Sequence, residues 1–306
     1  MPRFFLEGIS GLREDARLAH LRISRSEKLW EKLSKASYPV DGVLRIGGVP
    51  TFRFWRDLEN KQGQIKVCSI SPYPFSGLSW GGVHCFPHVY FESFFKDFDP
   101  LKCFESSKSQ AWIQQDRIYQ EHLQTLLQEE PQSEPSLFRW LSQKIPENSL
   151  LYLGNSLPIR EWDLAACGQD RNLAVYASRG VNGIDGQIST FLGLCRKEKG
   201  NWAILGDLTA LYDLAGPWIL SQLQSVKINL VIINNGGGKI FARMSSQQEF
   251  QNRHTLGFEP FARLWRVDYE KWHSIPAEAA SKHSRIIEIA PNEESTNRFW
   301  KKLEGL

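Results

Sequence analysis

The stretch AILGDLTALYDL, residues 203–214, carries the pattern that decides the fold. An apolar run ends in Gly206-Asp207 and leads into a segment with helical spacing. The next apolar run, residues 228–233, ends in the polar sequence NNGGG, residues 234–238. Strand, helix and strand in succession are typical of a parallel sheet. Both polar strand ends then fall at one edge of that sheet, where ligands bind in such folds.

The same alternation extends over the second half of the chain. Helical segments separate the apolar runs LLYLGN, LAVYAS, WAILGD, INLVIINN and RIIEIA. Short apolar runs of this kind are typical of parallel strands buried on both faces. The sequence therefore predicts an α/β protein with mostly parallel sheets covered by helices.

The first half contains a smaller unit of the same type. Residues 42–46 (GVLRI) predict a buried strand and residues 64–70 a second strand, with helices over 21–34 and 51–59, whereas 71–100 has no regular pattern. Two helices, 109–128 and 137–144, flank the punctuating sequence PQSEPS. We expect two three-layer α/β/α domains: an incomplete central domain over 1–105, a helical connection over 106–148, and a ligand-binding domain over 149–306.

Composition excludes several classes of protein. The 306 residues carry a net charge of only +3, without the clustered basic excess of a nucleic-acid-binding protein. Five cysteines lack CxxC spacing, which argues against a zinc site and favours reduced thiols. No apolar run has the eighteen or so residues of a membrane helix. We expect a cytoplasmic protein with no membrane span and no nucleic-acid partner.

Four polar clusters are expected at the carboxyl edge of the second sheet. They are Asn155-Ser156, Ser178-Arg179-Gly180, Gly206-Asp207 and Asn234-Asn235-Gly236-Gly237. A carboxylate, an amide oxygen and a backbone carbonyl are ligands that Mg²⁺ prefers, and Mg²⁺ usually binds phosphate oxygens as well. The amides at the start of the following helix are further candidates for phosphate binding. The clusters therefore predict a magnesium diphosphate site.

Simpler interpretations stay open for several of these residues. An Asp after a strand is often a helix N-cap, and a sequence such as NNGGG is often only a turn. Asp185 is expected to cap the helix that follows it. The histidines lack the mutual spacing of a metal site and are expected at the surface or in packing: His84, His88, His254 and His273.

The longer phrases resemble the thiamin-diphosphate enzymes. Their metal motif begins GDG and ends NN, and here Leu208 replaces its last glycine. Within that family the phrases are most similar to the branch of menaquinone biosynthesis that decarboxylates 2-oxoglutarate and adds the resulting unit to isochorismate. These phrases are GNSLPIR at 154–160, SRGVNGIDG at 178–186, NNGGGKIF at 234–241, SGLRED at 10–15 and VLRIGGVPTFRF at 43–54.

The resemblance implies a thiamin-diphosphate-binding fold for residues 149–306 and a set of site residues. Asp207, Asn235 and the carbonyl of Gly237 would hold Mg²⁺ and, through it, the cofactor's diphosphate. The other implied cofactor contacts are Ile184, Gly206, Leu208, Thr209, Ile240 and Phe241. Four positions match substrate-binding residues for the carboxylates of 2-oxoglutarate and isochorismate: Arg53, Ser156, Arg160 and Arg179.

The family's activating glutamate has no counterpart in this chain, so no catalytic residue is assigned. In the family that glutamate lies in an N-terminal pyrimidine-binding domain, and the cofactor binds between two subunits. The resemblance thus implies a homodimer or another oligomer, or a separate chain that supplies this domain, and inactivity of the chain alone. The alternatives are a non-catalytic remnant or association module, and a different thiamin-diphosphate 2-oxoacid decarboxylase or synthase.

Overall fold

The computed structural model describes the chain in two compact units. The described residues are 4–24, 42–51, 54–71, 73, 77–79, 84–87, 96, 107–180, 182–223, 225–242, 247–276, 279 and 281–305. The first unit comprises Met1–Ser10 with Arg17–His122, and the second comprises Gly11–Ala16 with Leu123–Leu306. No helix among the described residues is long and apolar enough to cross a membrane.

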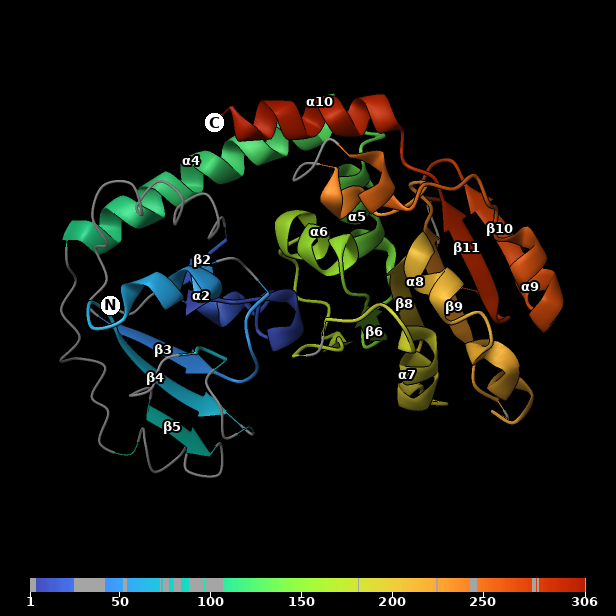
Figure 1. Cartoon of the computed structure of the whole chain (residues 1–306), viewed down its shortest axis with the longest axis horizontal. Helices are drawn as coiled ribbons and strands as arrows, with labels where there is room; N and C mark the ends of the chain where they lie inside the picture. The colour runs from blue at the N-terminus through green and yellow to red at the C-terminus, as the bar shows by residue number, and fades with distance from the viewer. Residues whose placement is uncertain are drawn as a thin grey trace. The chain divides into compact units, whose positions relative to one another are not determined.

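The second unit is built on a six-stranded sheet in the order β10-β11-β9-β8-β6-β7 (Figure 1). Every neighbouring pair in it is parallel. The strands are β6 (Leu150–Leu153), β7 (Ala174–Tyr176), β8 (Asn201–Gly206), β9 (Ile228–Ile233), β10 (Asp268–Trp272) and β11 (Arg285–Ile289). The sequence predicts all of these strands except β10, whose residues DYEKW form a polar edge strand. Strands β6 and β8 are adjacent, but the chain continues from β6 to β7 and from β8 to β9 in opposite directions across the sheet. Their carboxyl ends therefore mark the point where the strand order reverses, which is where ligands bind in such folds.

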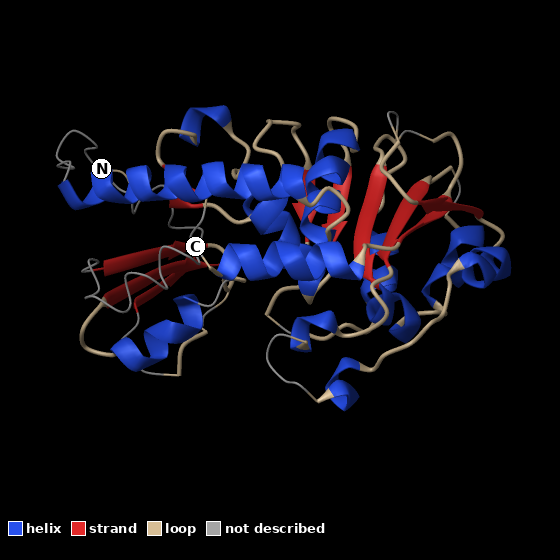
Figure 2. Cartoon of the chain, turned by 90° about the horizontal axis from the view of Figure 1, so that it is seen from above, coloured by secondary structure: helices blue, strands red, loops and turns tan. Residues whose placement is uncertain are grey.

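Helices cover both faces of this sheet (Figure 2). One face packs alternate strand residues, among them Tyr152, Leu205 and Leu230, against Phe191 and Phe261 of two helices. The intervening strand residues point to the opposite face and are also buried. The predicted three-layer arrangement is therefore confirmed for this unit. Its helices are α5 (Glu134–Lys144), α6 (Leu157–Ala165), α7 (Gln187–Leu194), α8 (Asp207–Tyr212), α9 (Glu259–Trp265) and α10 (Glu293–Glu304), with 3-10 turns η6 (Gly216–Ser221), η7 (Lys239–Phe241) and η8 (Gln248–Gln251).

The first unit contains a three-stranded parallel sheet in the order β3-β4-β5 and a two-stranded parallel pair, β1-β2. Its core packs Phe54, Trp55 and Leu58 against Ile65 and Val67. Its strands are β1 (Phe4–Phe5), β2 (Arg22–Ile23), β3 (Gly42–Ile46), β4 (Lys66–Ser71) and β5 (His84–Pro87). Its helical elements are η1 (Gly8–Ser10), η2 (Ala16–Leu18), α2 (Phe54–Asp57), η3 (Leu58–Lys61) and the first part of α4 (Ser107–Glu129).

Three sequence-based expectations for this unit are wrong. The helix expected over 21–34 is contradicted where the chain is described, since Arg22–Ile23 pairs as a strand with Phe4–Phe5. That pairing is non-local, so helical spacing alone does not reveal it. Strand β3 is not fully buried, because Leu44 and Ile46 are 42% and 51% exposed. Strand β5 lies in the segment expected to be irregular.

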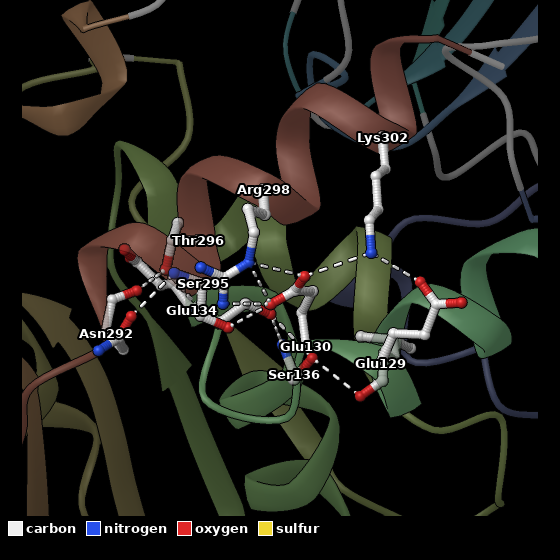
Figure 3. Close-up of polar contacts among 11 residues, drawn as sticks. Glu129, Glu130, Glu134, Ser136, Asn292, Ser295, Thr296, Arg298 and Lys302 are labelled. Carbon is white, nitrogen blue, oxygen red and sulfur yellow. Dashed lines mark hydrogen bonds and ion pairs between the residues drawn. The ribbon is translucent and has the colours of Figure 1, made fainter.

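Helix α10 is joined to the end of α4 by a network of charged hydrogen bonds (Figure 3). Arg298 donates from Nε to Glu130 Oε1 (3.0 Å) and from Nη2 to Oε2 (2.9 Å). Ser295 Oγ donates to Glu130 Oε2 (2.9 Å), and Lys302 Nζ contacts both Glu129 and Glu130. The hydrogen bonds from Arg298 are the main cause that lowers the pKa of Glu130 from 4.5 to about 2. The carboxylate thus holds α10 in place in its ionised form.

We expect the stability contribution of Glu130 to depend on pH. Because its pKa is lower in the folded state, the contribution is full above pH 4.5 and is lost as the pH falls towards about 2. Urea unfolding of Glu130→Gln should show reduced stability at pH 7, with a difference from the wild type that narrows below pH 4.5. Glu129→Gln, whose partner Lys302 is exposed, should differ little at any pH. A Glu130→Gln difference independent of pH would contradict this.

Candidate functional site

The parallel register brings three strand ends to one edge of the large sheet. Gly206 at the end of β8 pairs with Ile233 at the end of β9, and Leu153 at the end of β6 pairs with Ile204. The segments that follow, Asn155-Ser156, Asp207 and Asn234-Asn235, therefore leave the sheet at the same edge. This is the arrangement expected from the polar clusters.

Asp207 is the first residue of α8 and only 2% of it is exposed. Its Oδ2 accepts hydrogen bonds from the N–H groups of Gly236 (2.8 Å) and Gly237 (2.9 Å), and its Oδ1 accepts one from Leu208 (2.6 Å). Gly206, not Asp207, is the N-cap of the helix. Burial raises the pKa of Asp207, and the hydrogen bonds from Gly237 and Leu208 oppose this only in part. A buried carboxylate with a raised pKa is stabilised as an anion by a bound cation.

The glycine turn after β9 fits closely against the segment 251–254. Gly236 and Gly237 have φ angles of 80° and 132°, which L side chains rarely adopt. A Cβ on Gly237 would lie 2.5 Å from the Gln251 carbonyl oxygen, so no side chain fits there. The Gly237 carbonyl oxygen accepts a hydrogen bond from Lys239 N–H (2.9 Å), which leaves it one lone pair.

Asn235 has one satisfied and one unsatisfied end. Its Nδ2 donates to both carboxyl oxygens of Glu134, at 3.1 and 3.0 Å. Its Oδ1 is buried and has no hydrogen-bond partner among the described residues. Buried polar atoms rarely lack a hydrogen-bond partner, and an amide oxygen without one can serve as a ligand for a cation. Asn235 therefore fits the role of a metal ligand on the evidence of its own environment.

Glu134 is a buried acid that the sequence did not single out. It is the first residue of α5 and is 3% exposed. Burial is the main cause that raises its pKa to about 7, and the negative charge of Asp207 adds to the effect. Glu161 on α6 is a second buried carboxyl group, and its proximity influences the pKa of Glu134.

His254 contacts Asp207, so the expectation that it has only a surface or packing role is wrong. Its Nε2 lies 3.2 Å from Asp207 Oδ2. Its Nδ1 accepts a hydrogen bond from the Leu256 N–H (3.2 Å). Despite this closeness to Asp207, Nε2 is a buried atom without a hydrogen-bond partner among the described residues. Its backbone N–H also donates to the Gly236 carbonyl, which ties it to the glycine turn.

The residues expected to bind substrate gather around the segment after β6. Ser156 has φ 74° and ψ −127°, a conformation that non-glycine residues seldom adopt. Arg160 donates from Nη1 to the Ser156 carbonyl (2.5 Å), and Arg179 donates from Nη1 to Asn155 Oδ1 (3.2 Å). Both arginines are half-buried. Asn155, a buried residue without an assigned role in the sequence, thus connects Arg179 to the end of β6.

The other expected site residues lie on the same loops, with one exception. Leu208 and Thr209 follow Asp207 in α8, and the Leu208 N–H is used by Asp207 Oδ1, so that amide is not available for phosphate as expected. Ile184 is a half-buried loop residue before α7, close to Gly183, whose carbonyl accepts hydrogen bonds from Asn155 and Gln187. Ile240 and Phe241 lie in η7, and Phe241 is 45% exposed. Arg53 lies outside the described residues.

The expectation that Asp185 caps α7 is wrong. The N-cap is Gly186, which has a left-handed conformation with φ 64°. No side-chain hydrogen bond caps the helix. Asp185 is exposed and lies one residue before the N-cap, so its carboxylate does not cap the helix.

Among the described residues, no group of three or more His, Cys, Asp or Glu side chains is arranged to hold a metal ion. A metal at Asp207 would therefore depend on one carboxylate, neutral oxygen ligands and oxygens of its own partner ligand. This is the donor set that Mg²⁺ takes with phosphates, and it does not suit zinc.

No protein-family model matches the chain. It is 41% identical over 309 residues to the 2-succinyl-5-enolpyruvyl-6-hydroxy-3-cyclohexene-1-carboxylate synthase of Bdellovibrio bacteriovorus, which covers 99% of this chain and 56% of the relative. It is 31% identical to the synthase of the same name from Akkermansia muciniphila (97% and 56% covered) and 30% identical to that from Bacillus velezensis (72% and 40%). The chain thus spans about half the length of the curated relatives it matches.

Proposed function

Since the chain is homologous to 2-succinyl-5-enolpyruvyl-6-hydroxy-3-cyclohexene-1-carboxylate synthases over 99% of its length, we propose that it forms the magnesium and diphosphate side of a thiamin-diphosphate site. The activity we propose for the assembled enzyme is transfer of the decarboxylated 2-oxoglutarate unit to isochorismate in menaquinone biosynthesis. We also propose that the chain divides into an incomplete central domain (1–105), a helical connection (106–148) and the cofactor-binding domain (149–306).

The observation that carries this proposal is the unsatisfied Oδ1 of Asn235. It is buried and lacks a partner among the described residues, and the next two residues donate their N–H groups to Asp207. An acceptor left open beside a buried carboxylate is costly unless a donor or cation fills the place. Mg²⁺ held by Asp207, Asn235 and the Gly237 carbonyl, with diphosphate oxygens and water as its other ligands, supplies that partner.

The remaining residues have roles in holding the cofactor and the substrates. Gly206, Leu208 and Thr209 line the diphosphate side, and Ile184, Ile240 and Phe241 supply apolar contacts to the cofactor's rings. Arg160 and Arg179, oriented by Ser156 and Asn155, bind substrate carboxylates, because a guanidinium group pairs with two oxygens at once. Arg53 is proposed as a further carboxylate-binding residue.

When bound, thiamin diphosphate supplies the carbanion-stabilising chemistry for decarboxylation and carbon–carbon bond formation. The residues of this chain hold the diphosphate end, keep water from the buried Asp207 and orient the carboxylates of the substrates. The glutamate that activates the cofactor is proposed to come from a pyrimidine-binding domain outside the given sequence, in the same or another polypeptide. A dimer or other oligomer that brings the two domains together follows from this proposal.

Isothermal titration calorimetry tests the proposal directly. Thiamin diphosphate with Mg²⁺ is titrated into the chain with and without a separately expressed pyrimidine-binding domain of a relative. We expect Mg²⁺-dependent binding that is strengthened by the added domain, with product formed from 2-oxoglutarate and isochorismate only when both are present. Absence of binding in every combination would contradict the proposal and favour a non-catalytic association module. Turnover of another 2-oxoacid in place of 2-oxoglutarate would favour a different thiamin-diphosphate enzyme.

A further inference from the structure

We propose that Glu134 is a positioning residue for the metal site: its carboxylate fixes the side-chain amide of Asn235 so that the amide oxygen faces the cation. This inference rests on the proposed function, because it assigns a role to Glu134 towards the metal that Asn235 would bind.

The two hydrogen bonds from Asn235 decide which end of its amide points where. An amide group has a donor end and an acceptor end, and both carboxyl oxygens of Glu134 accept from the donor end of Asn235. Asn235 Nδ2 lies 3.1 and 3.0 Å from the two oxygens of Glu134, so its nitrogen is held there. Its Oδ1 must then point away from Glu134, and this is the atom left without a partner among the described residues. A flipped amide would lose both of these hydrogen bonds.

The position of Glu134 is itself fixed by the start of helix α5 (Figure 3). Ser133 caps the helix by accepting a hydrogen bond from the Ser136 N–H (3.4 Å). The Glu134 N–H donates to Thr296 Oγ1 (3.0 Å) on α10. The backbone N–H of Asn292, the N-cap of α10, donates to the Gln132 carbonyl (3.0 Å). A residue whose backbone is held from two helices can orient a neighbouring ligand with little freedom.

Helix α10 also contacts the segment that follows the glycine turn. Glu293, in the first turn of α10, forms an ion pair with Lys239 (2.6 Å), two residues after Gly237. Helix α10 therefore contacts both the segment that carries Glu134 and η7, which follows the glycine turn. Glu161, a second buried acid on α6, adds to the buried surroundings of Glu134. No other charged side chain among the described residues donates to or accepts from Asn235.

Glu134→Gln, made in the wild type and in the Asn235→Asp variant, tests this role because its effect on Mn²⁺ binding should reverse between the two. In Glu134→Gln, an amide nitrogen replaces one of the two oxygens that accept from Asn235 Nδ2, which weakens the hold on Nδ2 and offers Asn235 Oδ1 a donor in competition with the cation. We expect about tenfold to hundredfold weaker Mn²⁺ binding, measured by the loss of the aqueous Mn²⁺ signal in electron paramagnetic resonance, since partners of metal ligands typically have effects of this size. In the Asn235→Asp background the same change should strengthen Mn²⁺ binding, because the introduced amide now donates to a carboxylate that Glu134 repels.

Controls separate this role from general effects. Glu293→Gln removes a negative charge near the same turn without touching Asn235, and should leave Mn²⁺ affinity within about threefold of the wild type, since Glu293 is largely exposed. Circular dichroism of each variant checks folding. A second readout needs no metal: the side-chain amide signals of Asn235, assigned by their loss in Asn235→Asp, should be protected from solvent exchange in the wild type and lose that protection in Glu134→Ala.

The outcomes distinguish this inference from the proposed function. Reversal of the effect of Glu134→Gln between the two backgrounds supports the inference. Asp207-dependent Mn²⁺ binding that ignores Glu134→Gln overturns the inference and leaves the proposed function standing. Equal weakening in both backgrounds also overturns it, because it indicates a structural role. Mn²⁺ binding that ignores Asp207 overturns the proposed function, and unprotected amide signals in the wild type overturn the positioning of Asn235 itself.

Discussion

Asp207→Ala is expected to abolish the Mg²⁺-dependent binding of thiamin diphosphate, with a loss of at least about a hundredfold in affinity. Removing the carboxylate takes away the charged ligand of the proposed site, and 10–100-fold is already typical for partners one shell further out. The substitution also leaves the N–H groups of Gly236, Gly237 and Leu208 without their acceptor. Calorimetric titration of Mg²⁺ and thiamin diphosphate, with the pyrimidine-binding domain present, measures the effect.

Asp207→Asn separates charge from shape. Its amide nitrogen would face one of the N–H donors, so we expect it to weaken cofactor binding nearly as much while it keeps the volume of the side chain. Asp213→Asn is the matched control at the other end of α8, where the carboxylate accepts hydrogen bonds from Ser189 N–H (2.7 Å) and Oγ (3.0 Å). It should bind the cofactor as the wild type does. Unchanged affinity in Asp207→Ala would move the metal away from the β8–β9 edge.

The sequence predicts the large sheet well because most residues of its central strands are apolar. The sheet is buried on both faces at β6, β8, β9 and β11. Short apolar segments of this kind are typical of parallel strands. Strand β10 escapes the same reasoning, since an edge strand with the sequence DYEKW has no such run. The strand pair Phe4–Phe5 with Arg22–Ile23 escapes it too, because it depends on a contact between distant residues.

The expected site residues could be predicted because they follow directly after predicted strands. The residues that contact and orient them could not be predicted in this way. Asp207 and Asn235 are visible because they end apolar runs that the fold makes neighbours. Glu134 and His254 lie 101 and 47 positions away from their partners Asn235 and Asp207 in the sequence. Only the tertiary fold brings these groups together. The sequence signal for Glu134 is its place in Ser133-Glu134-Pro135, which reads as an ordinary helix start.

Glu288→Ala is expected to lower the free energy of unfolding by about 3–5 kcal/mol, since each buried donor left without an acceptor costs about 1–3 kcal/mol. Glu288 is 1% exposed on β11 and accepts hydrogen bonds from Phe258 N–H (2.8 Å), Tyr269 Oη (2.9 Å) and Asn234 Nδ2 (3.0 Å). Its removal leaves three donors from three different segments unsatisfied at once. Urea unfolding followed by circular dichroism at pH 7 measures the loss.

The pH dependence of Glu288 gives this prediction a sign. Burial alone would raise the pKa of Glu288, but hydrogen bonds from Phe258, Asn234 and Tyr269 outweigh it and lower the pKa below 4.5. The contribution is therefore full above pH 4.5 and is lost as the pH falls through the lower, folded-state value. We expect the difference between the wild type and Glu288→Gln, which keeps the shape without the charge, to narrow in acid.

Glu288 also anchors the segment that carries Asn235, the proposed metal ligand. Its loss should therefore weaken cofactor binding as well as stability. Asn234, which immediately precedes Asn235, is held by Glu288 Oε1 and by the Leu256 carbonyl (2.8 Å). In Glu288→Gln the introduced amide cannot accept from every donor, and the loop loses part of this anchor. Glu259→Gln on α9 is the control, since its pair with Arg263 is exposed and should change stability by less than about 0.5 kcal/mol. A Glu288→Ala protein as stable as this control would show that the three donors find other partners and that the loop is held elsewhere.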